Sequence, residues 1–254
     1  MGKIFKNMIP YWKTLIIVLM LLFVQAWCDL SLPSYTSDII DVGIMNQGVE
    51  HIVPEAVTAD EFELAKLLMT EDEASVWEDC FEADGDIYVC TVIEEERLEE
   101  LDETLMIPLL MNYQMSAIDE ETFRASLAEQ TGMDASMLDQ MSIEQIGTSM
   151  GMELTSFEKE TEDEDGNISV VTCVDMRQIL KVMQAAGMVD QEQILAMRDE
   201  MQTTLDTMGS SLVKSMGIAY AVECNEAAGL DIEEIQTSYL WNAGLKMVAM
   251  ALIM

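Results

Sequence analysis

The amino-acid sequence predicts a membrane protein, mainly α-helical, in which one complete transmembrane helix and the start of a second flank an α+β domain. Both ends of the 254-residue chain are apolar, and the acidic residues are concentrated between them. The acidic part carries helix-capping motifs and two hairpin turns beside apolar periodic runs. We therefore expect three parts: residues 1–43, an elbow and the first transmembrane helix; residues 44–230, an acidic, mostly helical domain with two small β-hairpins; and residues 231–254, a helix leading into an incomplete second transmembrane helix.

The first apolar segment is long enough to cross a bilayer. Residues 14–28, TLIIVLMLLFVQAWC, carry no charge. A helix over Thr14–Ser37 has 24 residues and would be about 36 Å long, against a hydrocarbon core of about 30 Å. Aromatic residues, which gather at membrane interfaces, flank the segment: Tyr11, Trp12, Trp27 and Tyr35. Membrane lipid is therefore an expected partner.

Lysines set the expected orientation of this helix. Lys3, Lys6 and Lys13 precede it, and positive residues favour the cytoplasmic side. We expect a cytoplasmic N-terminus in the plasma membrane of a bacterium, with residues 44–238 extracytoplasmic. A cleaved signal peptide is the alternative, because the basic start and the run LIIVLMLLFV fit one. However, VQAW before Cys28 places Trp27 where the cleavage site needs a small residue, which favours a retained helix.

The negative charge of the chain belongs to its middle. Three of the 48 acidic residues precede Ile44 and none follows Ser238, so the remaining 45 lie between them, beside only eight basic residues. The central segment therefore has a formal charge of −37, against −36 for the whole chain. Such a surface repels DNA, RNA and anionic lipid headgroups, so the sequence predicts no nucleic-acid partner.

Three short motifs predict helix starts within and after the acidic segment. TADE at Thr58–Glu61 and SIEQ at Ser142–Gln145 fit the capping box, in which the first side chain accepts from an exposed backbone N–H and the fourth reaches back. DIEE at Asp231–Glu234 is a looser version that begins with Asp. Each precedes an apolar periodic run, such as FELAKLLM after Thr58.

Two Asp-Gly pairs predict β-hairpins, because Asp-Gly tolerates the positive φ that tight turns require. They are Asp84-Gly85 and Asp165-Gly166, and a helical pattern follows each hairpin (residues 94–106 and 175–188). Both turns share the core D-G-[DN]-I-x-V. Six matched positions leave two interpretations open: an internal repeat of a hairpin–helix unit, or turn chemistry that the two hairpins share by coincidence.

The five cysteines are odd in number and give no disulfide framework. Cys80 and Cys90 bracket the first hairpin. A three-residue loop (residues 84–86) would place them opposite one another and allow a disulfide, whereas a two-residue loop would place them on opposite faces. The sequence leaves both arrangements open.

Two short motifs resemble catalytic or nucleotide-binding signatures, but neither meets every requirement of such a site. GTSMG at Gly147–Gly151 matches the G-x-S-x-G nucleophile elbow. A hydrolase triad of that type needs a later histidine, but the only histidine is His51, and the flanks look helical. His51 is expected to be a surface residue near the membrane edge. The string GSSLVKS at Gly209–Ser215 has Val213 where a P-loop needs glycine, so no nucleotide-binding loop is expected.

Metal sites are weakly suggested and also rejected. If Gly85 or Gly166 stood at the sixth position of an EF-hand loop, its ends would be Cys80 and Thr91, or Thr161 and Thr172, where carboxylates are needed. Neither turn is therefore an EF-hand, and only a weak surface calcium site stays open as an alternative. Met133, Met137 and Met141 have the spacing of one helix face, but core packing explains that spacing better than Cu(I) does. The sequence therefore predicts no catalytic, cofactor-binding or metal-binding residue in this chain.

Both ends of the chain resemble one family. DLSLPSYTSDIIDVGI at Asp29–Ile44, after the basic elbow and long helix, resembles the first transmembrane helix of half-transporters of bacterial heterodimeric ABC exporters. ECNEAAGLDIEEIQTSYL at Glu223–Leu240, followed by GLKM at Gly244–Met247, resembles the approach to their second transmembrane helix. Some members carry a large extracytoplasmic insertion between these helices, where this chain has its acidic segment.

The resemblance implies that this chain is the N-terminal part of the transmembrane subunit of an ATP-driven exporter of multidrug, lipid or peptide type. A complete half-transporter has six transmembrane helices and a nucleotide-binding domain, so we expect the chain to be truncated. ATP, Mg²⁺ and ATP hydrolysis belong to segments outside it, and a second half-transporter is the expected partner. The alternative is a free-standing, membrane-tethered acidic domain that binds a partner outside the cell.

Overall fold

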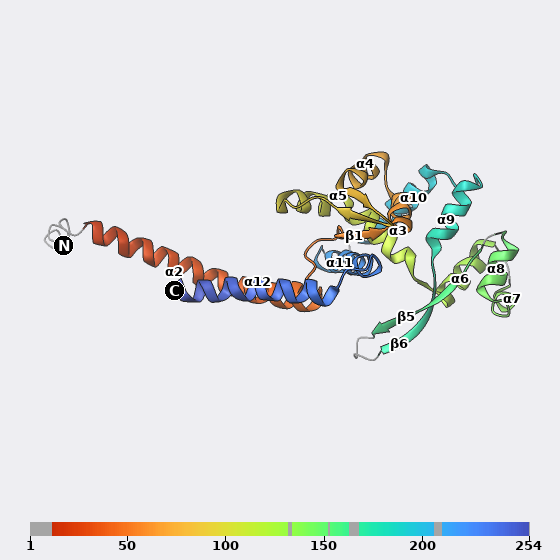
Figure 1. Cartoon of the computed structure of the whole chain (residues 1–254). Coiled ribbons are helices and arrows are strands. Elements are labelled where there is room, and N and C mark those ends of the chain that lie inside the picture. Colours follow the sequence, from red (N-terminus) through yellow and green to blue (C-terminus); the bar gives the residue numbers. More distant parts are fainter. Residues whose placement is uncertain (1–11, 132–133, 152, 163–167, 206–209, 254) are drawn as a thin grey trace. The chain divides into compact units, whose positions relative to one another are not determined.

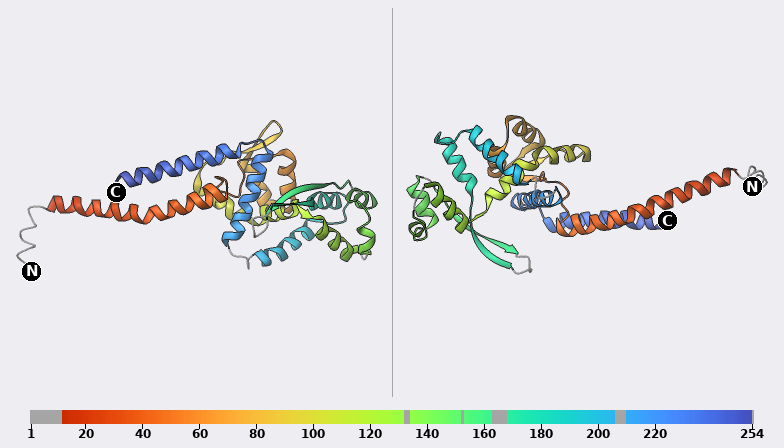
Figure 2. Two further views of the ribbon diagram at one scale, coloured as in Figure 1. Left: turned by 90° about the horizontal axis from the view of Figure 1, so that it is seen from below. Right: turned by 180° about the vertical axis from the view of Figure 1, so that it is seen from behind.

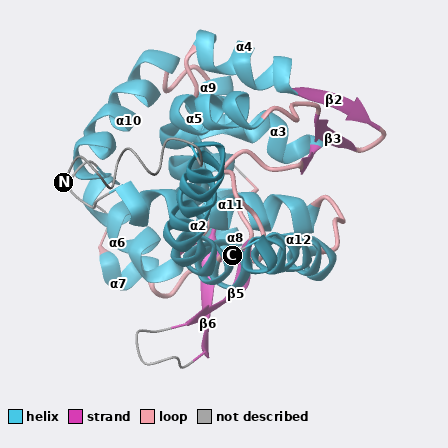
Figure 3. Ribbon diagram, turned by 90° about the vertical axis from the view of Figure 1, so that its left-hand side faces the viewer, coloured by secondary structure: helices cyan, strands magenta, loops and turns pink. Residues whose placement is uncertain are grey.

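The computed structural model describes residues 12–131, 134–151, 153–162, 168–205 and 210–253. They form two compact units, one made of the chain up to Glu50 together with the chain from Asp231 onward, and the other of His51–Leu230. Helices dominate the described residues, and the strands are confined to two small sheets (Figure 3). The expected mainly helical fold with a long apolar N-terminal helix is therefore confirmed.

The first unit consists of two long helices with exposed apolar surfaces. Helix α2 (Trp12–Asp38) continues as the π-helix η2 (Ile39–Met45), and α12 (Ile232–Ile253) lies beside them (Figures 1 and 2). The stretch Trp12–Met45 is the one helix among the described residues that is long and apolar enough to cross a membrane, by length and composition; a signal sequence near the N-terminus would meet the same criterion. The helix predicted over Thr14–Ser37 is confirmed.

Glycines allow the end of the first helix to approach the start of α12 closely. A Cβ at Gly43 would lie 2.6 Å from Leu240 Cδ2, and Gly43 O accepts a hydrogen bond of 2.7 Å from Gln236 Nε2. Gly48 has φ +85°, and a Cβ there would lie 2.7 Å from Gln236 Cα. Small residues at helix contacts permit such close backbone packing. The C-terminal end of the first helix therefore meets the N-terminal half of α12.

The second unit begins with a strand–helix–hairpin–helix module, residues 56–116. A short strand β1 (Ala56–Thr58) leads into α3 (Ala59–Ala65), the 3₁₀ turn η3 (Lys66–Leu68) and α4 (Glu71–Cys80). The hairpin of β2 (Phe81–Asp84) and β3 (Ile87–Cys90) follows, and then α5 (Glu95–Ser116). The antiparallel sheet has the order β1-β3-β2, so the second hairpin strand is central.

Residues 118–185 repeat the same order of elements. Strand β4 (Ile118–Asp119) leads into α6 (Glu120–Thr131), α7 (Ala135–Leu138) and α8 (Ile143–Ser149). The hairpin of β5 (Ser156–Glu162) and β6 (Ile168–Val174) comes next, followed by α9 (Met176–Ala185). The sheet order β4-β6-β5 again places the second hairpin strand at the centre. Helices α10 (Gln191–Leu205) and α11 (Ser210–Ala227) complete the unit.

The repeat is one of topology and is larger than the hairpin–helix unit suggested by the sequence. Strand β1 pairs with the turn-proximal residues 87–89 of β3, whereas β4 pairs with residues 173–174 at the far end of β6. The described part of the shared D-G-[DN]-I-x-V core therefore occupies different positions relative to the third strand in the two sheets. The turn at Asp165-Gly166 itself lies outside the described residues.

The first hairpin turns one residue later than expected. Asp84 pairs with Ile87, so the two-residue loop is Gly85-Asp86, and Gly85 supplies the positive φ of 65°. Cys90 is consequently opposite Phe81, while Cys80 lies one residue outside the ladder. The two-residue alternative is thus the observed one. Both thiols are free.

The capping motifs are confirmed in part. Ser142 and Gln145 form the full capping box of α8, and Asp231 accepts from Glu234 N at the start of α12. Thr58 accepts from Glu61 N at 3.3 Å, but the Glu61 side chain does not complete that box. Its carboxylate instead accepts hydrogen bonds from Arg177, Asn112 and Tyr220.

Separate apolar clusters hold the two modules. In the first, Phe62 stacks on Tyr88 with ring centroids 4.0 Å apart, and the fully buried Trp77 donates its Nε1–H to Phe62 O at 3.3 Å. The core of the second module is formed by Phe123, Leu127, Leu138, Ile143, Ile146, Leu154, Val174 and Ile179. A third cluster joins the two modules through side chains of the η3 turn, α5, α9 and α10: Leu68, Met111, Met115, Leu180 and Ile194.

We predict that Gly48→Ala destabilises the first unit, because alanine must adopt a left-handed conformation there and also meets Gln236. The left-handed conformation alone costs about 1–2 kcal/mol. Gly244→Ala is the matched control: a Cβ at Gly244 meets nothing within 4 Å, so helix propensity should leave that variant neutral or slightly more stable. Thermal unfolding of the full chain in detergent, followed by circular dichroism, measures both. Equal effects would contradict the packing described here.

Candidate functional site

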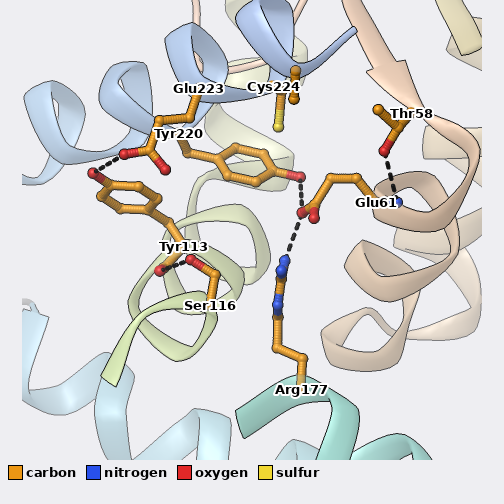
Figure 4. Close-up of a pocket in the computed structure, with 9 residues that line it drawn as sticks. Thr58, Glu61, Tyr113, Ser116, Arg177, Tyr220, Glu223 and Cys224 are labelled. Carbon is orange, nitrogen blue, oxygen red and sulfur yellow. Dashed lines mark hydrogen bonds and ion pairs between the residues drawn. The ribbon is translucent and has the colours of Figure 1, made fainter. Parts of the chain in front are cut away.

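A polar pocket of about 160 Å³ lies in the second unit, at the junction of the two modules (Figure 4). Helices α3, α5, α9 and α11 supply nearly all of its walls, so residues far apart in the sequence converge on it. Two tyrosines and two glutamates are among its lining residues, which are Thr58, Glu61, Tyr113, Ser116, Arg177, Tyr220, Glu223, Cys224 and Ala227. It is therefore the natural candidate for a binding site.

Glu61 is the centre of the hydrogen-bond network on one side of this pocket. Its Oε1 accepts from Arg177 Nη1 at 2.6 Å, from Asn112 Nδ2 at 2.6 Å and from the Tyr220 hydroxyl at 3.0 Å. Asn112 is fully buried and Tyr220 nearly so. A buried polar group costs free energy unless it is hydrogen-bonded, and here each group satisfies another. One carboxylate thus links α3, α5, α9 and α11.

Arg177 is neutralised on two sides. Asp175 accepts from Arg177 Nε at 3.0 Å and from Nη2 at 2.9 Å, a bidentate pair, while Nη1 bonds Glu61 and Asn112 Oδ1. The side chain is only 7% exposed. Interactions with these two carboxylates outweigh burial and raise the pKa of Arg177, so the guanidinium stays charged. A guanidinium fork is suited to such a planar, fixed arrangement.

The opposite side of the pocket holds a second charged group. Glu223 Oε1 accepts from the Tyr113 hydroxyl at 3.1 Å and lies 2.6 Å from Lys159 Nζ. The Lys159 ammonium also sits 4.8 Å from the centroid of the Tyr113 ring. Tyr113 and Tyr220 approach edge to face at 6.3 Å. The lysine comes from β5, so the second hairpin reaches the α5–α11 side of the pocket.

The electrostatics of the pocket favour binding over nucleophilic chemistry. Burial and the nearby Glu61 carboxylate raise the pKa of the Cys224 thiol well above its usual range, and burial does the same for the Tyr220 hydroxyl. Both groups are therefore neutral near pH 7, where a cysteine nucleophile would need to be a thiolate. Within the described residues no group of three or more His, Cys, Asp or Glu side chains could hold a metal ion.

A separate polar cluster surrounds His51, and the expectation of a surface histidine is wrong. His51 Nδ1 lies 2.9 Å from Asp102 Oδ2 and Nε2 lies 3.4 Å from Glu95 Oε1, with the histidine side chain 13% exposed. Asp102, which is buried, also accepts from Ile52 N at 2.9 Å, and Lys214 Nζ approaches it at 3.7 Å. The hydrogen bond to Asp102 raises the pKa of His51 despite its burial.

The motifs rejected from sequence fall on ordinary helices. Ser149 lies in the last turn of α8 and donates to Ile146 O at 2.7 Å, so the flank before GTSMG is helical, as expected. The described residues that follow Ser149 are not helical: Met150 and Gly151 form a turn, and strand β5 begins at Ser156. Val213 packs inside α11 beside Leu110, in a helix rather than a phosphate loop. The described part of the GSSLVKS string is helical, and Gly209 lies outside the described residues.

The methionine face predicted for Met133, Met137 and Met141 is wrong. Helix α7 ends at Leu138, before Met141, because Ser142 caps the next helix. Met137 is exposed, whereas Met141 packs on the core of the second module. Met133 lies outside the described residues.

Sequence reasoning missed every residue of the pocket network, although two signals were present. Arg177 occupies the first turn of α9, where the helix dipole disfavours a cation, so it needs a buried acidic partner. Glu61 stands at the fourth position of the capping motif TADE, so the sequence assigned it to a helix cap. Its side chain instead bonds residues that are distant in the sequence. Tyr113 and Tyr220 carry no signal beyond helical spacing.

Comparisons of the chain with protein-family models, with curated proteins and with solved structures found no match. The interpretation of the pocket and of the whole chain therefore depends on its own geometry and sequence.

We predict that Glu61→Ala destabilises the second unit by on the order of 3 kcal/mol, because it leaves the buried side chains of Arg177, Asn112 and Tyr220 without their shared partner. Glu63→Ala is the matched control on the same helix: Glu63 is 55% exposed and pairs with Lys66, a surface ion pair worth about 0–1 kcal/mol. Urea unfolding of the full chain in detergent measures both variants. A similar small loss in both would contradict the central place of Glu61.

We also predict that the His51 cluster stabilises the fold more at acidic than at alkaline pH. A raised pKa in the folded state means that the contribution is complete below the unfolded value of about 6.5 and is lost as the pH rises through the folded value. The stability difference between wild type and His51→Gln should therefore shrink as the pH rises from about 6.5 into the alkaline range. Because His51 is the only histidine, one imidazole NMR signal reports its titration.

The midpoint of that signal should lie above about 6.5 in the wild type and should fall in Asp102→Asn, which removes the charge of the main partner. A wild-type midpoint at or below 6.5 would show that burial outweighs the acidic neighbours, and the pH dependence would then have the opposite sign.

Proposed function

We propose that this chain is the N-terminal part of the transmembrane subunit of a bacterial heterodimeric ABC exporter, with residues 51–230 as an extracytoplasmic domain between its first two membrane helices. The observation that carries the proposal is the helix pair of the first unit. The end of η2 packs on the start of α12 at Gly43 and Gly48, so the helices run antiparallel from one shared end. That is the arrangement of two membrane helices joined on one side of a bilayer.

The surfaces of these helices support a lipid environment. On α2, the side chains of Leu21, Phe23 and Leu30 are 62%, 76% and 79% exposed. On α12, those of Trp241, Leu245 and Leu252 are 76%, 68% and 83% exposed. Soluble proteins rarely expose so large a continuous apolar surface, and within a bilayer a helix also satisfies its own backbone. Helix α12 does not pass the length and composition criterion by itself, so its role as a second span depends on this pairing and on the resemblance.

Charge supports the orientation. The lysines that precede α2 favour a cytoplasmic N-terminus, and the acidic domain is then extracytoplasmic, where it repels anionic headgroups. In the intact exporter, ATP and Mg²⁺ would bind a nucleotide-binding domain outside this chain, a second half-transporter would complete the membrane pathway, and a solute would move outward.

The alternative function, a membrane-tethered binding domain, is favoured by one observation: residues 51–230 form a compact unit with a pocket of their own.

We predict that a reporter fused after Glu120 is extracytoplasmic in bacterial cells: alkaline phosphatase should be active there and green fluorescent protein dark. A fusion after Lys3 should give the opposite pair of results. The full chain of 28.5 kDa should stay in the membrane fraction after carbonate extraction. A shorter, soluble product would mean that the first helix is a cleaved signal peptide and would contradict the membrane proposal.

The exporter and the tethered domain differ in the DNA that follows the codon of Met254. The exporter proposal expects an open frame that encodes further apolar segments and a Walker A loop. A stop codon with no such segments after it in any frame would reject the exporter and leave the topology result standing.

A further inference from the structure

The ammonium group of Lys159 is held between a carboxylate and an aromatic ring. Its Nζ lies 2.6 Å from Glu223 Oε1 and 4.8 Å from the centroid of the Tyr113 ring, and the Tyr113 hydroxyl donates to the same carboxylate oxygen. A carboxylate beside an aromatic face is the arrangement by which proteins recognise alkylammonium cations. Here the bound cation belongs to the protein itself.

The two residues that hold Lys159 also line the pocket. Glu223 and Tyr113 hold the lysine and also line the cavity of about 160 Å³, together with Tyr220 and Glu61 (Figure 4). The Lys159 side chain is 27% exposed, and Glu223 is 45% exposed. A small solute can therefore reach the carboxylate from outside without unfolding the domain.

The charged groups on the two sides of the pocket differ in the number of partners that hold them. Arg177 is held in place by Glu61, Asn112 and a bidentate Asp175, so it is a fixed, buried part of the wall. Glu223 has one described cationic partner, Lys159, on a flexible four-carbon stem. If the Lys159 side chain moved away, the Glu223 carboxylate and the face of the Tyr113 ring would be free to bind another cation. The domain around it, with its large excess of acidic residues, attracts cations and excludes anions.

We propose that this pocket binds a small primary alkylammonium ion at Glu223 and Tyr113, and that Lys159 is a built-in competitor for the same position. The ligand's ammonium group replaces the Lys159 ammonium on Glu223, and its carbon chain extends along the Tyr113 and Tyr220 rings. Binding releases the contact through which β5 reaches α5 and α11. This inference goes beyond the proposed exporter function and does not depend on it.

The test uses n-butylammonium, which has the chemistry of the lysine side chain, and the purified full chain in detergent at physiological salt. Lys159→Met removes the internal cation and keeps an unbranched side chain of similar length. Isothermal titration calorimetry should show one saturable site per chain in Lys159→Met, with affinity at least about tenfold higher than in wild type. Adding Glu223→Gln to Lys159→Met should lower that affinity by about tenfold or more, because the ligand's ammonium group loses a hydrogen bond to a charged acceptor.

Glu82→Gln in the Lys159→Met background is the control, because Glu82 is an exposed acid of β2 and the charge change is identical. It should leave the affinity unchanged, whereas diffuse attraction to an acidic protein would respond to both substitutions alike. Thermal unfolding establishes that each variant is folded. If Lys159→Met does not fold, the wild type must itself bind n-butylammonium saturably and the single variant Glu223→Gln must bind at least about tenfold more weakly.

Three results would overturn the proposal: no saturable binding in folded Lys159→Met, binding at many sites per chain, or affinity that is indifferent to Glu223. Each would mean that Lys159 and Glu223 form a structural ion pair only. None of them bears on whether the chain belongs to an exporter, which the reporter fusions and the downstream coding sequence test separately.

Discussion

The packing of the two modules in residues 51–230 depends on one partly buried carboxylate. Glu61 accepts three hydrogen bonds on a single oxygen, from Arg177, Asn112 and Tyr220, and these partners lie on three other helices. The two modules have separate apolar cores, so this bond set and the apolar cluster around Met111 and Leu180 fix one module against the other. Polar groups buried at such a junction are costly in any arrangement that leaves one unpaired, and they therefore specify a single packing.

The same bond set borders the pocket. Glu61, Arg177 and Tyr220 line a cavity of about 160 Å³, which Tyr113 and Glu223 also line. Arg177 is committed to two carboxylates, whereas Lys159 pairs with Glu223 from a partly exposed strand. The wall of the pocket is therefore rigid on the Arg177 side and exchangeable on the Lys159 side, which is what a site needs if it is to release one cation and accept another.

The sequence predicted what is encoded locally. The apolar helix, the hairpins, the helix starts at Ser142 and Asp231, and the helices after each hairpin follow from periodicity, turn residues and caps. It did not predict β1 and β4, because strands of three and two residues carry no period. It assigned Glu61 to a cap and His51 to the surface, since local patterns cannot show that Arg177 lies 116 positions away in the chain yet 2.6 Å away in space, or that Asp102 lies beneath the histidine.

Helices α5 and α11 connect the pocket to both ends of the domain. Ile52, the second residue of the domain, is fully buried, and its backbone N–H donates to Asp102 of α5. The Ile52 side chain also packs closely on α11, because a Cβ at Gly217 would lie only 2.7 Å from Ile52 Cγ2. Helix α11 itself ends at Ala227, three residues before the domain does. Tyr113 and Glu223 are on these same two helices. A cation that displaced Lys159 would therefore act on the two helices that hold both ends of the domain.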